Sequence, residues 1–433
     1  MTSIEQLYQH YLKHPVVCTD TRAITQGCLF FALKGEKFDA NEFAQKAVEA
    51  GAAFAVVDNA AFAQGEQFVL VDDVLETLQA LAKHHRQQLN IPVIGLTGSN
   101  GKTTTKELIR AVLAEHFSVF ATKGNLNNHI GVPLSILSID RAIEIAVIEM
   151  GANHQKEIEF LCSIAQPTHG LISNVGMAHL EGFGGFEGVK KGKAELYAYL
   201  SAHNGQVFVN AANLDLIEMV NKATVKNVVH YNVTEPNAVH GVLKHSDPLI
   251  ELDWMYAGNT YAAKANLTGI YNFENILAAI SIGCFFKLSA QEINQGLANY
   301  FPTNNRSQLA KTERNTVICD FYNANPSSMA AAIANLNSLS AAKKVAILGD
   351  MFELGPESAK QHQNIIELAL KNNIDTLVFV GVHFFEVSGQ YQAHFFETPA
   401  QAVNFIEAQN WKDSLILLKG SRGMALEQLL PLL

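Results

Sequence analysis

A glycine-rich stretch carries the residue types that bind the phosphates of a nucleotide; it reads Thr97-Gly98-Ser99-Asn100-Gly101-Lys102-Thr103-Thr104. The apolar run Val93–Leu96 before it predicts a buried parallel strand, and the spacing of apolar residues over 104–116 predicts a helix. Such a turn points backbone N–H groups at a polyphosphate. Lys102 would neutralise phosphate charge, and the Thr103 hydroxyl would bind Mg²⁺. The stretch predicts a nucleoside triphosphate site, although Leu96 stands where a strict P-loop has its first glycine.

A carboxylate and a histidine follow two other apolar runs. Glu149 ends the run Ile145–Ile148, where a carboxylate can bind Mg²⁺ or can simply end the strand. His179 lies in a glycine-containing turn after a strand. An imidazole there can reach a metal or a phosphate, but a single histidine is more often structural. Further along, Lys190 and Lys191 indicate a solvated basic face.

Polar residues that suit a nucleotide or an acidic substrate lie in the second half of the chain. Asn272 and Asn275 stand near a predicted helix start, where their amides could bind an adenine edge or cap the helix. Asp320 follows a strand, and a carboxylate in that position suits a ribose. Lys419 and Arg422, in a glycine-containing loop after another strand, could bind a carboxylate or a phosphate.

Composition narrows the class of protein. The chain has 433 residues, which exceeds what one hydrophobic core usually holds. A net charge of −10 argues against binding nucleic acid by bulk attraction. The five cysteines lack metal-ligand spacing and are typical of a reducing compartment. With no apolar segment of membrane-spanning length and no signal-type stretch, we expect a soluble, cytoplasmic protein that binds neither membranes nor nucleic acid.

The order of predicted strands and helices divides the chain into three α/β domains. Residues 1–88 predict a small α/β unit that ends in a helix over 74–88. Residues 89–307 alternate strands and helices, which predicts a mostly parallel sheet with helices on both faces. Residues 308–433 predict a smaller Rossmann-like sheet. Shorter strands and turn residues over 225–265 predict an antiparallel patch on the edge of the middle sheet.

The motifs together resemble those of the Mur ligase family, and the resemblance covers nearly the whole chain in the family's order. Beside the phosphate loop it rests on five further blocks, which are Asp20-Thr21-Arg22, residues 124–133 (GNLNNHIGVP), residues 174–181 (NVGMAHLE), Tyr322-Asn323-Ala324-Asn325-Pro326 and residues 349–355 (GDMFELG) with His362. The last two blocks are typical of the D-alanyl-D-alanine-adding branch. Tyr271 and Asn305 depart from the family pattern, which has His and Gly there.

The resemblance implies roles for residues that the bare sequence does not assign. Thr103, Glu149 and His179 would bind two Mg²⁺ ions, together with Lys193, which matches a lysine that is carbamylated in the family and so acts as a carboxylate-like ligand. Lys102, His179 and Lys193 would be the catalytic set. Asn272, Asn275, Arg306 and Asp320 would surround ATP. Contacts to the other substrates would come from Thr21, Arg22, Asn128, Tyr322, Asn323, Asn325, Lys419 and Arg422.

The resemblance also implies an activity. It is an ATP-dependent ligation that joins D-Ala-D-Ala to a UDP-MurNAc-tripeptide through an acyl phosphate, with the N-terminal domain holding the nucleotide sugar and the enzyme acting as a monomer. Two alternatives stay open: another ligase of the family, such as a diaminopimelate- or lysine-adding enzyme or a folylpolyglutamate synthase, and a regulatory P-loop ATPase. The identity of the third peptide residue is not predicted.

Overall fold

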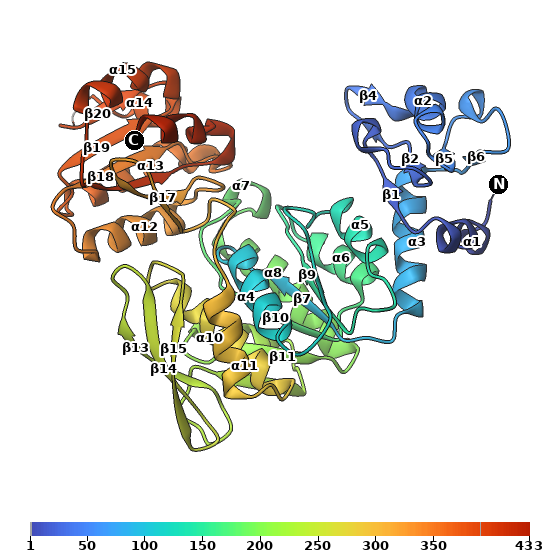
Figure 1. Cartoon of the computed structure of the whole chain (residues 1–433), viewed down its shortest axis with the longest axis horizontal. Helices are drawn as coiled ribbons and strands as arrows, with labels where there is room; N and C mark the ends of the chain where they lie inside the picture. Colours follow the sequence, from blue (N-terminus) through green and yellow to red (C-terminus); the bar gives the residue numbers. More distant parts are fainter. Residues whose placement is uncertain (1, 390) are drawn as a thin grey trace.

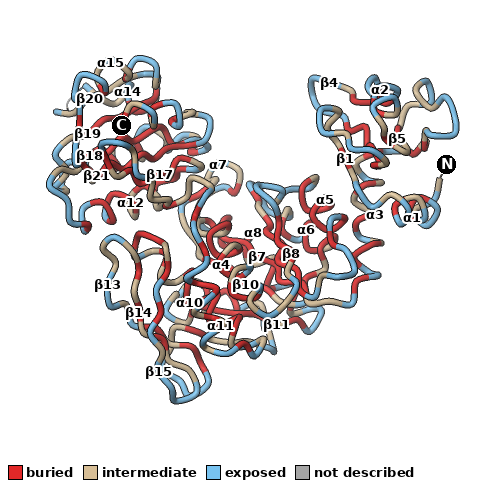
Figure 2. Tube along the Cα trace, viewed as in Figure 1, coloured by how far each residue is buried: buried red, intermediate tan, exposed pale blue. Residues whose placement is uncertain are grey.

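The computed structural model describes residues 2–389 and 391–433, which form three lobes that each contain a mainly parallel sheet (Figure 1). The predicted α/β class is confirmed. Buried residues concentrate along the sheets (Figure 2). Within the described residues, no helix has both the length and the apolar character needed to cross a membrane.

The N-terminal lobe contains a parallel sheet in the order β1-β2-β5-β6. Its first helix begins at a capping box between Ser3 and Gln6, which satisfies two backbone donors at the helix start. The elements are α1 (Ile4–Lys13), β1 (Val17–Cys18), η1 (Thr21–Ala23), β2 (Leu29–Phe31), β3 (Lys34–Gly35), β4 (Phe38–Asp39), η2 (Ala40–Phe43), α2 (Ala44–Glu49), β5 (Phe54–Val57), η3 (Ala60–Phe62), β6 (Phe68–Leu70) and α3 (Val74–Gln88).

The middle lobe carries a parallel sheet in the order β12-β11-β10-β7-β9-β8, covered by helices on both faces. The strands β7, β9, β10 and β11 in the middle of this sheet are almost wholly buried and mainly apolar, because helices cover both faces. The elements are β7 (Val93–Thr97), α4 (Lys102–Leu113), β8 (Val119–Ala121), α5 (Gly131–Leu137), β9 (Ile145–Glu149), α6 (Glu157–Ala165), β10 (His169–Ile172), α7 (Leu180–Phe183), α8 (Phe186–Ala202), β11 (Gln206–Asn210), α9 (Leu214–Lys222), β12 (Asn227–Tyr231), α10 (Asn272–Phe285) and α11 (Ala290–Asn299).

The predicted antiparallel patch is wrong in part. The strand β12 pairs in parallel with β11 and so extends the main sheet. Only β13 (His240–His245), β14 (Ile250–Tyr256) and β15 (Asn259–Ala265) are antiparallel, and they form a separate sheet. Its apolar face, with the buried Trp254, packs with α10 and α11 in one core. The same apolar side chains could pack against these helices or against the edge of the main sheet. The sequence pattern is compatible with both arrangements and does not distinguish them.

The C-terminal lobe contains a sheet in the order β16-β17-β21-β18-β19-β20, parallel except for β16. This agrees with the predicted Rossmann-like arrangement. The elements are β16 (Gln308–Lys311), β17 (Thr316–Asp320), α12 (Pro326–Ser338), β18 (Lys344–Gly349), η4 (Gly355–Glu357), α13 (Ser358–Leu370), β19 (Thr376–Val380), α14 (Val382–Glu386), β20 (His394–Phe396), α15 (Pro399–Gln409), β21 (Leu415–Lys419), η5 (Arg422–Met424) and η6 (Leu426–Leu432).

The helix α3 joins the first two lobes. Leu78 and Leu81 lie in the same apolar core as residues of α5 and α6. Near its end, the Arg86 side chain donates to the backbone carbonyls of Ala165 and Gln166 at 2.9 and 3.0 Å. The helix thus packs on the middle lobe, which ties the orientation of the N-terminal lobe to it (Figure 1). The boundary near residue 88 stays a prediction.

The helix after the phosphate loop is held by close contact with α11. A Cβ added at Gly296 would lie 2.5 Å from the Cα of Val112 in α4. Because this contact is with the backbone, a change of side-chain rotamer cannot relieve the clash. We expect Gly296→Ala to lower the free energy of unfolding by about 1–3 kcal/mol through overpacking. Chemical denaturation followed by tryptophan fluorescence would measure this, with Gly389→Ala as the control because its Cβ would meet open space. An unchanged midpoint for Gly296→Ala would contradict the packing argument.

Candidate active site

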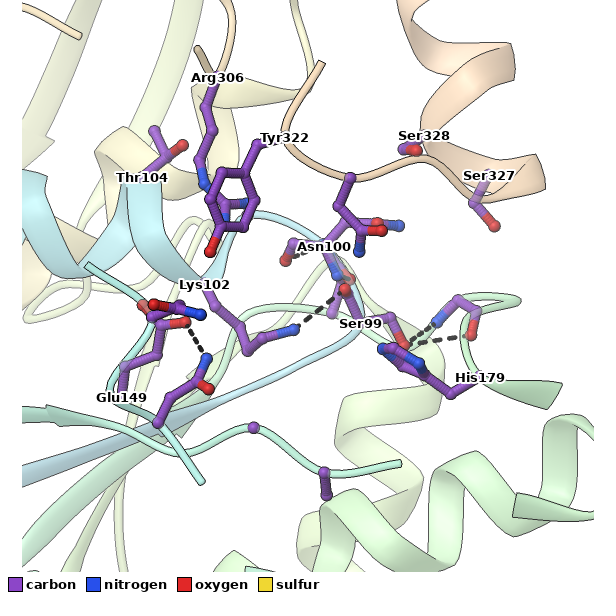
Figure 3. A pocket seen from close by; sticks show the side chains of 18 of the residues that line it. Ser99, Asn100, Lys102, Thr104, Glu149, His179, Arg306, Tyr322, Ser327 and Ser328 are labelled. Carbon is purple, nitrogen blue, oxygen red and sulfur yellow. Dashed lines mark hydrogen bonds between the residues drawn. The ribbon is translucent and has the colours of Figure 1, made fainter. Parts of the chain in front are cut away.

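A cavity of about 760 Å³ lies where the middle and C-terminal lobes face one another. The phosphate loop, the end of β9, the loop after β10 and the start of α10 contribute from the middle lobe, and the loops after β17 and β21 from the C-terminal lobe. Figure 3 shows several of the side chains. The predicted residues that line the cavity are Ser99, Asn100, Gly101, Lys102, Thr104, Asn128, Glu149, His179, Asn272, Asn275, Arg306, Asp320, Tyr322, Asn323, Lys419 and Arg422.

Two glycines let the phosphate loop turn tightly. Gly98 has φ +148°, and a Cβ there would lie 2.0 Å from the Ser173 hydroxyl oxygen. Gly101 has φ +77° and caps α4, and its Cβ would lie 2.8 Å from Asn275 Oδ1. Only glycine combines such φ values with so little space. The loop is therefore held against β10 and α10, which fixes the start of α4 at the cavity.

Lys102 lies along the phosphate loop. Its Nζ donates to the carbonyls of Gly98 and Ser99 at 2.7 and 3.2 Å (Figure 3). Burial lowers the pKa of Lys102 to about 8, with the charge of Arg306 acting in the same direction and that of Glu149 opposing it. An anion bound in the loop would favour the ammonium form, because an opposite charge nearby stabilises it. The positive charge of Lys102 is thus only partly balanced by neighbouring negative charge, and a bound anion would balance it.

Glu149 is a buried carboxylate with an unused oxygen. Its Oε1 accepts a hydrogen bond from Asn127 Nδ2 at 2.8 Å, whereas its Oε2 has no hydrogen-bond partner among the described residues. The nearest cation to Oε2 in an ion pair is the buried Lys106, whose Nζ lies 3.9 Å away. A buried carboxylate oxygen without a donor is costly unless a charge compensates it. The position therefore fits a metal ion.

His179 is engaged with a residue of the other lobe. It has φ +53°, and its Nδ1 contacts a carboxylate oxygen of Glu353. This contact lowers the pKa of the Glu353 carboxyl. Among the described residues, no three His, Cys, Asp or Glu side chains are grouped so that they could hold a metal ion. Glu149 and His179 therefore line one cavity without forming a ready-made metal cluster.

Two lysines of α8 have opposite environments. Lys193 is 1% exposed and donates to the Ala152 carbonyl at 3.3 Å, and burial holds its pKa well below the usual value. Lys190 instead pairs with Asp215 and Glu218 at 2.9 and 2.7 Å, which raises its pKa. Lys191 is exposed. The prediction of a solvated basic face is wrong for Lys190, because the start of α9 supplies two carboxylates.

The predicted nucleotide residues meet at the junction of the lobes. Asn275 accepts from Thr105 Oγ1 at 3.0 Å and donates to Asn272, whose own amide donates to the Thr268 carbonyl at 2.8 Å. The N-cap residue of α10 is Tyr271. Neither asparagine is therefore the N-cap, which removes one of the two readings left open by the sequence.

Several charged residues of the C-terminal lobe are already paired. Lys419 Nζ lies 2.7 Å from Asp320 Oδ2, and the pair is largely buried. Two guanidinium groups contact the ring of Tyr322, with Arg306 at 4.0 Å and Arg422 at 5.2 Å from its centroid. The Lys419 charge is thus neutralised by Asp320, whereas the two arginines remain available to an anion at the cavity.

Some predicted residues do not line this cavity. Thr21 and Arg22 lie in η1 of the N-terminal lobe, where Arg22 forms an exposed ion pair with Asp20 at 2.7 Å. Thr103 lines a second cavity, which shares Arg306 and Tyr322 with the first. The remaining three, which lie behind or beside the lining, are Gly98, Lys193 and Asn325.

Three residues at the site were missed by the sequence reasoning. Glu353 reaches His179 from the block at 349–355, which supported the family resemblance but to whose glutamate no role was assigned. Lys106 lies one helical turn after Lys102, and that spacing was a usable signal. Asn174 donates to and accepts from the backbone of Asn100, and its role depends on the pairing of β10 with β7.

Comparison with known proteins assigns the chain to a family. Residues 15–86 match the model described as "Mur ligase family, catalytic domain", residues 96–283 match "Mur ligase middle domain", and residues 305–422 match "Mur ligase, glutamate ligase domain". The UDP-N-acetylmuramoyl-tripeptide–D-alanyl-D-alanine ligase of Bacillus subtilis is 34% identical and that of Escherichia coli 35%. Each alignment covers 95% of this chain and 92% of the relative.

Solved structures agree. The crystal structure of MurF from Acinetobacter baumannii has a TM-score of 0.87 at 30% identity, covering 96% of this chain and 92% of that one. MurF ligase from Thermotoga maritima, in complex with ADP, has a TM-score of 0.85 at 26% identity, covering 100% and 98%. Relatives above 30% identity that span nearly the whole chain, together with matching folds, leave one conclusion. This chain belongs to the Mur ligase family.

Proposed function

We propose that this protein is an ATP-dependent ligase that joins D-Ala-D-Ala to UDP-MurNAc-tripeptide and so makes the UDP-MurNAc-pentapeptide precursor of peptidoglycan. The observation that carries the proposal is that a phosphate loop faces a second lobe across one cavity, next to the buried carboxylate of Glu149, whose Oε2 accepts no hydrogen bond among the described residues. The relatives from Bacillus subtilis and Escherichia coli bear the name of this activity.

The reaction needs the terminal carboxylate of the tripeptide to receive the γ-phosphoryl group of ATP, after which the amine of D-Ala-D-Ala attacks the acyl phosphate. Lys102 and the N–H groups at the start of α4 would hold the phosphates and offset their charge. Arg306 and Asp320 would hold the nucleoside end. Closure of the C-terminal lobe over the cavity would exclude water from the acyl phosphate, which water would otherwise hydrolyse.

The proposed metal site rests on this chain's donor set. Glu149 fits a divalent cation because its buried Oε2 lacks a donor among the described side chains. Thr103 and His179 would complete the site together with a carbamylated Lys193. When bound, Mg²⁺ would offset charge on the transferring phosphoryl group. Burial favours the neutral amine of Lys193, and only a neutral amine can add CO₂ to form a carbamate.

We assign the other substrate contacts by lobe. Thr21 and Arg22 of the N-terminal lobe would bind the uridine nucleotide, and Asn128 would contact the substrate from the middle lobe. Tyr322, Asn323, Asn325, Lys419 and Arg422 of the C-terminal lobe would serve the peptide and the dipeptide. We propose domain boundaries at 88/89 and 307/308, a monomeric state, and a cytoplasmic location, the last consistent with the free thiols of all five cysteines.

Phosphate release with purified protein tests the function. We expect release only when Mg·ATP, UDP-MurNAc-tripeptide and D-Ala-D-Ala are all present, with the UDP-pentapeptide seen by mass spectrometry. Release without the dipeptide would indicate a P-loop ATPase and overturn the proposal. Ligation of diaminopimelate, lysine or glutamate in place of D-Ala-D-Ala would point to another ligase of the family. Parallel assays with diaminopimelate- and lysine-containing tripeptides identify the third residue.

A further inference from the structure

We propose that Asn325 is a positioning residue that couples the seating of the C-terminal lobe to the conformation of the phosphate loop. Its Nδ2 donates to Oδ1 of Asn100 across the junction between the lobes at 2.7 Å. Asn325 is 4% exposed. The inference rests on the proposed function in one respect, namely that the loop at 98–104 binds the phosphates of ATP.

The side chain of Asn325 is held in place from its own lobe. It is the N-cap of α12, where its Oδ1 accepts from the Ser328 N–H at 2.9 Å and its own N–H donates to Ser328 Oγ at 3.1 Å. This reciprocal pair is a capping box, and Pro326 at the first helical position fixes the entry of the chain. Because the amide oxygen is committed to the helix, the amide nitrogen points in a fixed direction, toward Asn100.

The partner, Asn100, is equally constrained. Its N–H donates to Asn174 Oδ1 at 2.9 Å, and its carbonyl accepts from Ser173 Oγ at 2.6 Å and from Asn174 Nδ2 at 3.1 Å. Its backbone is therefore fixed to the loop after β10, and its side chain is left to bond Asn325. A shift of α12 would therefore displace the backbone in the middle of the phosphate loop, and not only the side chain of Asn100.

A second bond from the same helix start supports the coupling. Ser327 Oγ accepts from the N–H of Met177 at 3.1 Å. Met177 lies two residues before His179, in the loop that also exchanges hydrogen bonds between Gly176 and Ser99. One turn of α12 thus contacts both the phosphate loop and the loop that carries His179. The position of the C-terminal lobe therefore affects two parts of the proposed ATP site, the phosphate loop and the loop that carries His179.

The test separates the capping role of Asn325 from its contact with Asn100. Serine is a good N-cap but is too short to reach Asn100, so Asn325→Ser should keep α12 stable and lose only the bond between the lobes. We expect the thermal midpoint to stay near that of the wild type. The affinity for the non-hydrolysable analogue AMP-PNP with Mg²⁺, measured by calorimetry, should fall about 3- to 10-fold, the scale of one net hydrogen bond.

A double-mutant cycle with Asn100→Ala decides whether the two residues act together. Coupled residues should make the double variant no weaker in AMP-PNP binding than either single variant. Thr398→Ala, which removes the N-cap of α15 in the same lobe, is the control for a purely structural loss and should change the thermal midpoint alone. Additive losses in the cycle, or wild-type binding by Asn325→Ser, would overturn the coupling.

Three outcomes keep this inference apart from the proposed function. A rise only in KM for D-Ala-D-Ala, with AMP-PNP affinity unchanged, would leave Asn325 with the proposed substrate contact alone and refute the coupling. If the wild-type protein itself failed to bind AMP-PNP, the ATP site would be wrong and the coupling would fall with it. If the wild-type protein ligated D-Ala-D-Ala and Asn325→Ser bound AMP-PNP as tightly as the wild type, only the coupling would be refuted.

Discussion

Replacement of Lys102 with alanine is expected to reduce ligation by roughly 10³-fold or more, the scale seen when a cationic group at a transferring phosphoryl is removed. The Lys102 ammonium is the cation that the phosphate loop itself contributes to the cavity, and its hydrogen bonds to the loop carbonyls hold it there. In the proposed function it would offset the charge of the phosphates. Steady-state phosphate release and AMP-PNP binding would measure the loss. The near-ultraviolet circular dichroism should match that of the wild type.

The control for Lys102 is a lysine that makes no such contacts. Lys123 is exposed, so Lys123→Ala removes one positive charge from the same lobe without touching the loop. It should retain full turnover. If Lys102→Ala kept more than about a tenth of the wild-type rate, the assignment of residues 98–104 as the catalytic phosphate loop would be refuted.

Replacement of Lys193 with methionine should have the second large effect. Methionine fills a similar volume, so the buried position stays packed, but it cannot form a carbamate. We expect a loss of activity of about 10²–10³-fold, the size of one removed electrostatic contact to the transition state. The wild-type protein in ¹³C-bicarbonate should show a carbamate carbon resonance that disappears in Lys193→Met.

Lys190 on the same helix is the matched control. Its ion pairs with Asp215 and Glu218 raise its pKa, so it stays protonated and should not add CO₂, whereas burial lowers the pKa of Lys193. The carbamate resonance should therefore survive in Lys190→Met. A resonance that persists in Lys193→Met but is lost in Lys190→Met would reverse the assignment, and no resonance in the wild type would remove the carbamate altogether.

Local motifs made the strongest sequence predictions. The strand at 93–97, the glycine turn and the helix after it are neighbours in the chain, so their geometry depends little on the rest of the molecule. The same holds for Glu149 at the end of β9, since parallel strands bring their carboxyl ends to one edge. Asp320 was predicted from its place after a strand, the family resemblance added Arg306, and both line the same cavity in the structure.

Other predictions failed or stayed open because they depend on distant partners. Lys190 was expected to be solvated, but it forms ion pairs with two carboxylates of α9. The strand β12 was expected in an antiparallel patch, but it pairs in parallel with β11 over its whole length. The N-cap interpretation of Asn272 and Asn275 was removed only by the position of Tyr271 at the helix start, and their contact with adenine stays a prediction. In each case the residue type is compatible with either environment, and packing between segments far apart in sequence selects one.

The sequence alone predicted a triphosphate site on a parallel α/β sheet and showed the motifs of the Mur ligase family. Those conclusions follow from residue types at short spacing, which fix backbone turns and helix starts locally. The tertiary structure decided which loops face one another. It buried Lys193, left one oxygen of Glu149 without a donor among the described residues, and brought Asn325 to Asn100 across 225 positions of the chain. The reason is physical: burial and the seating of one lobe on another arise from contacts summed over the whole chain.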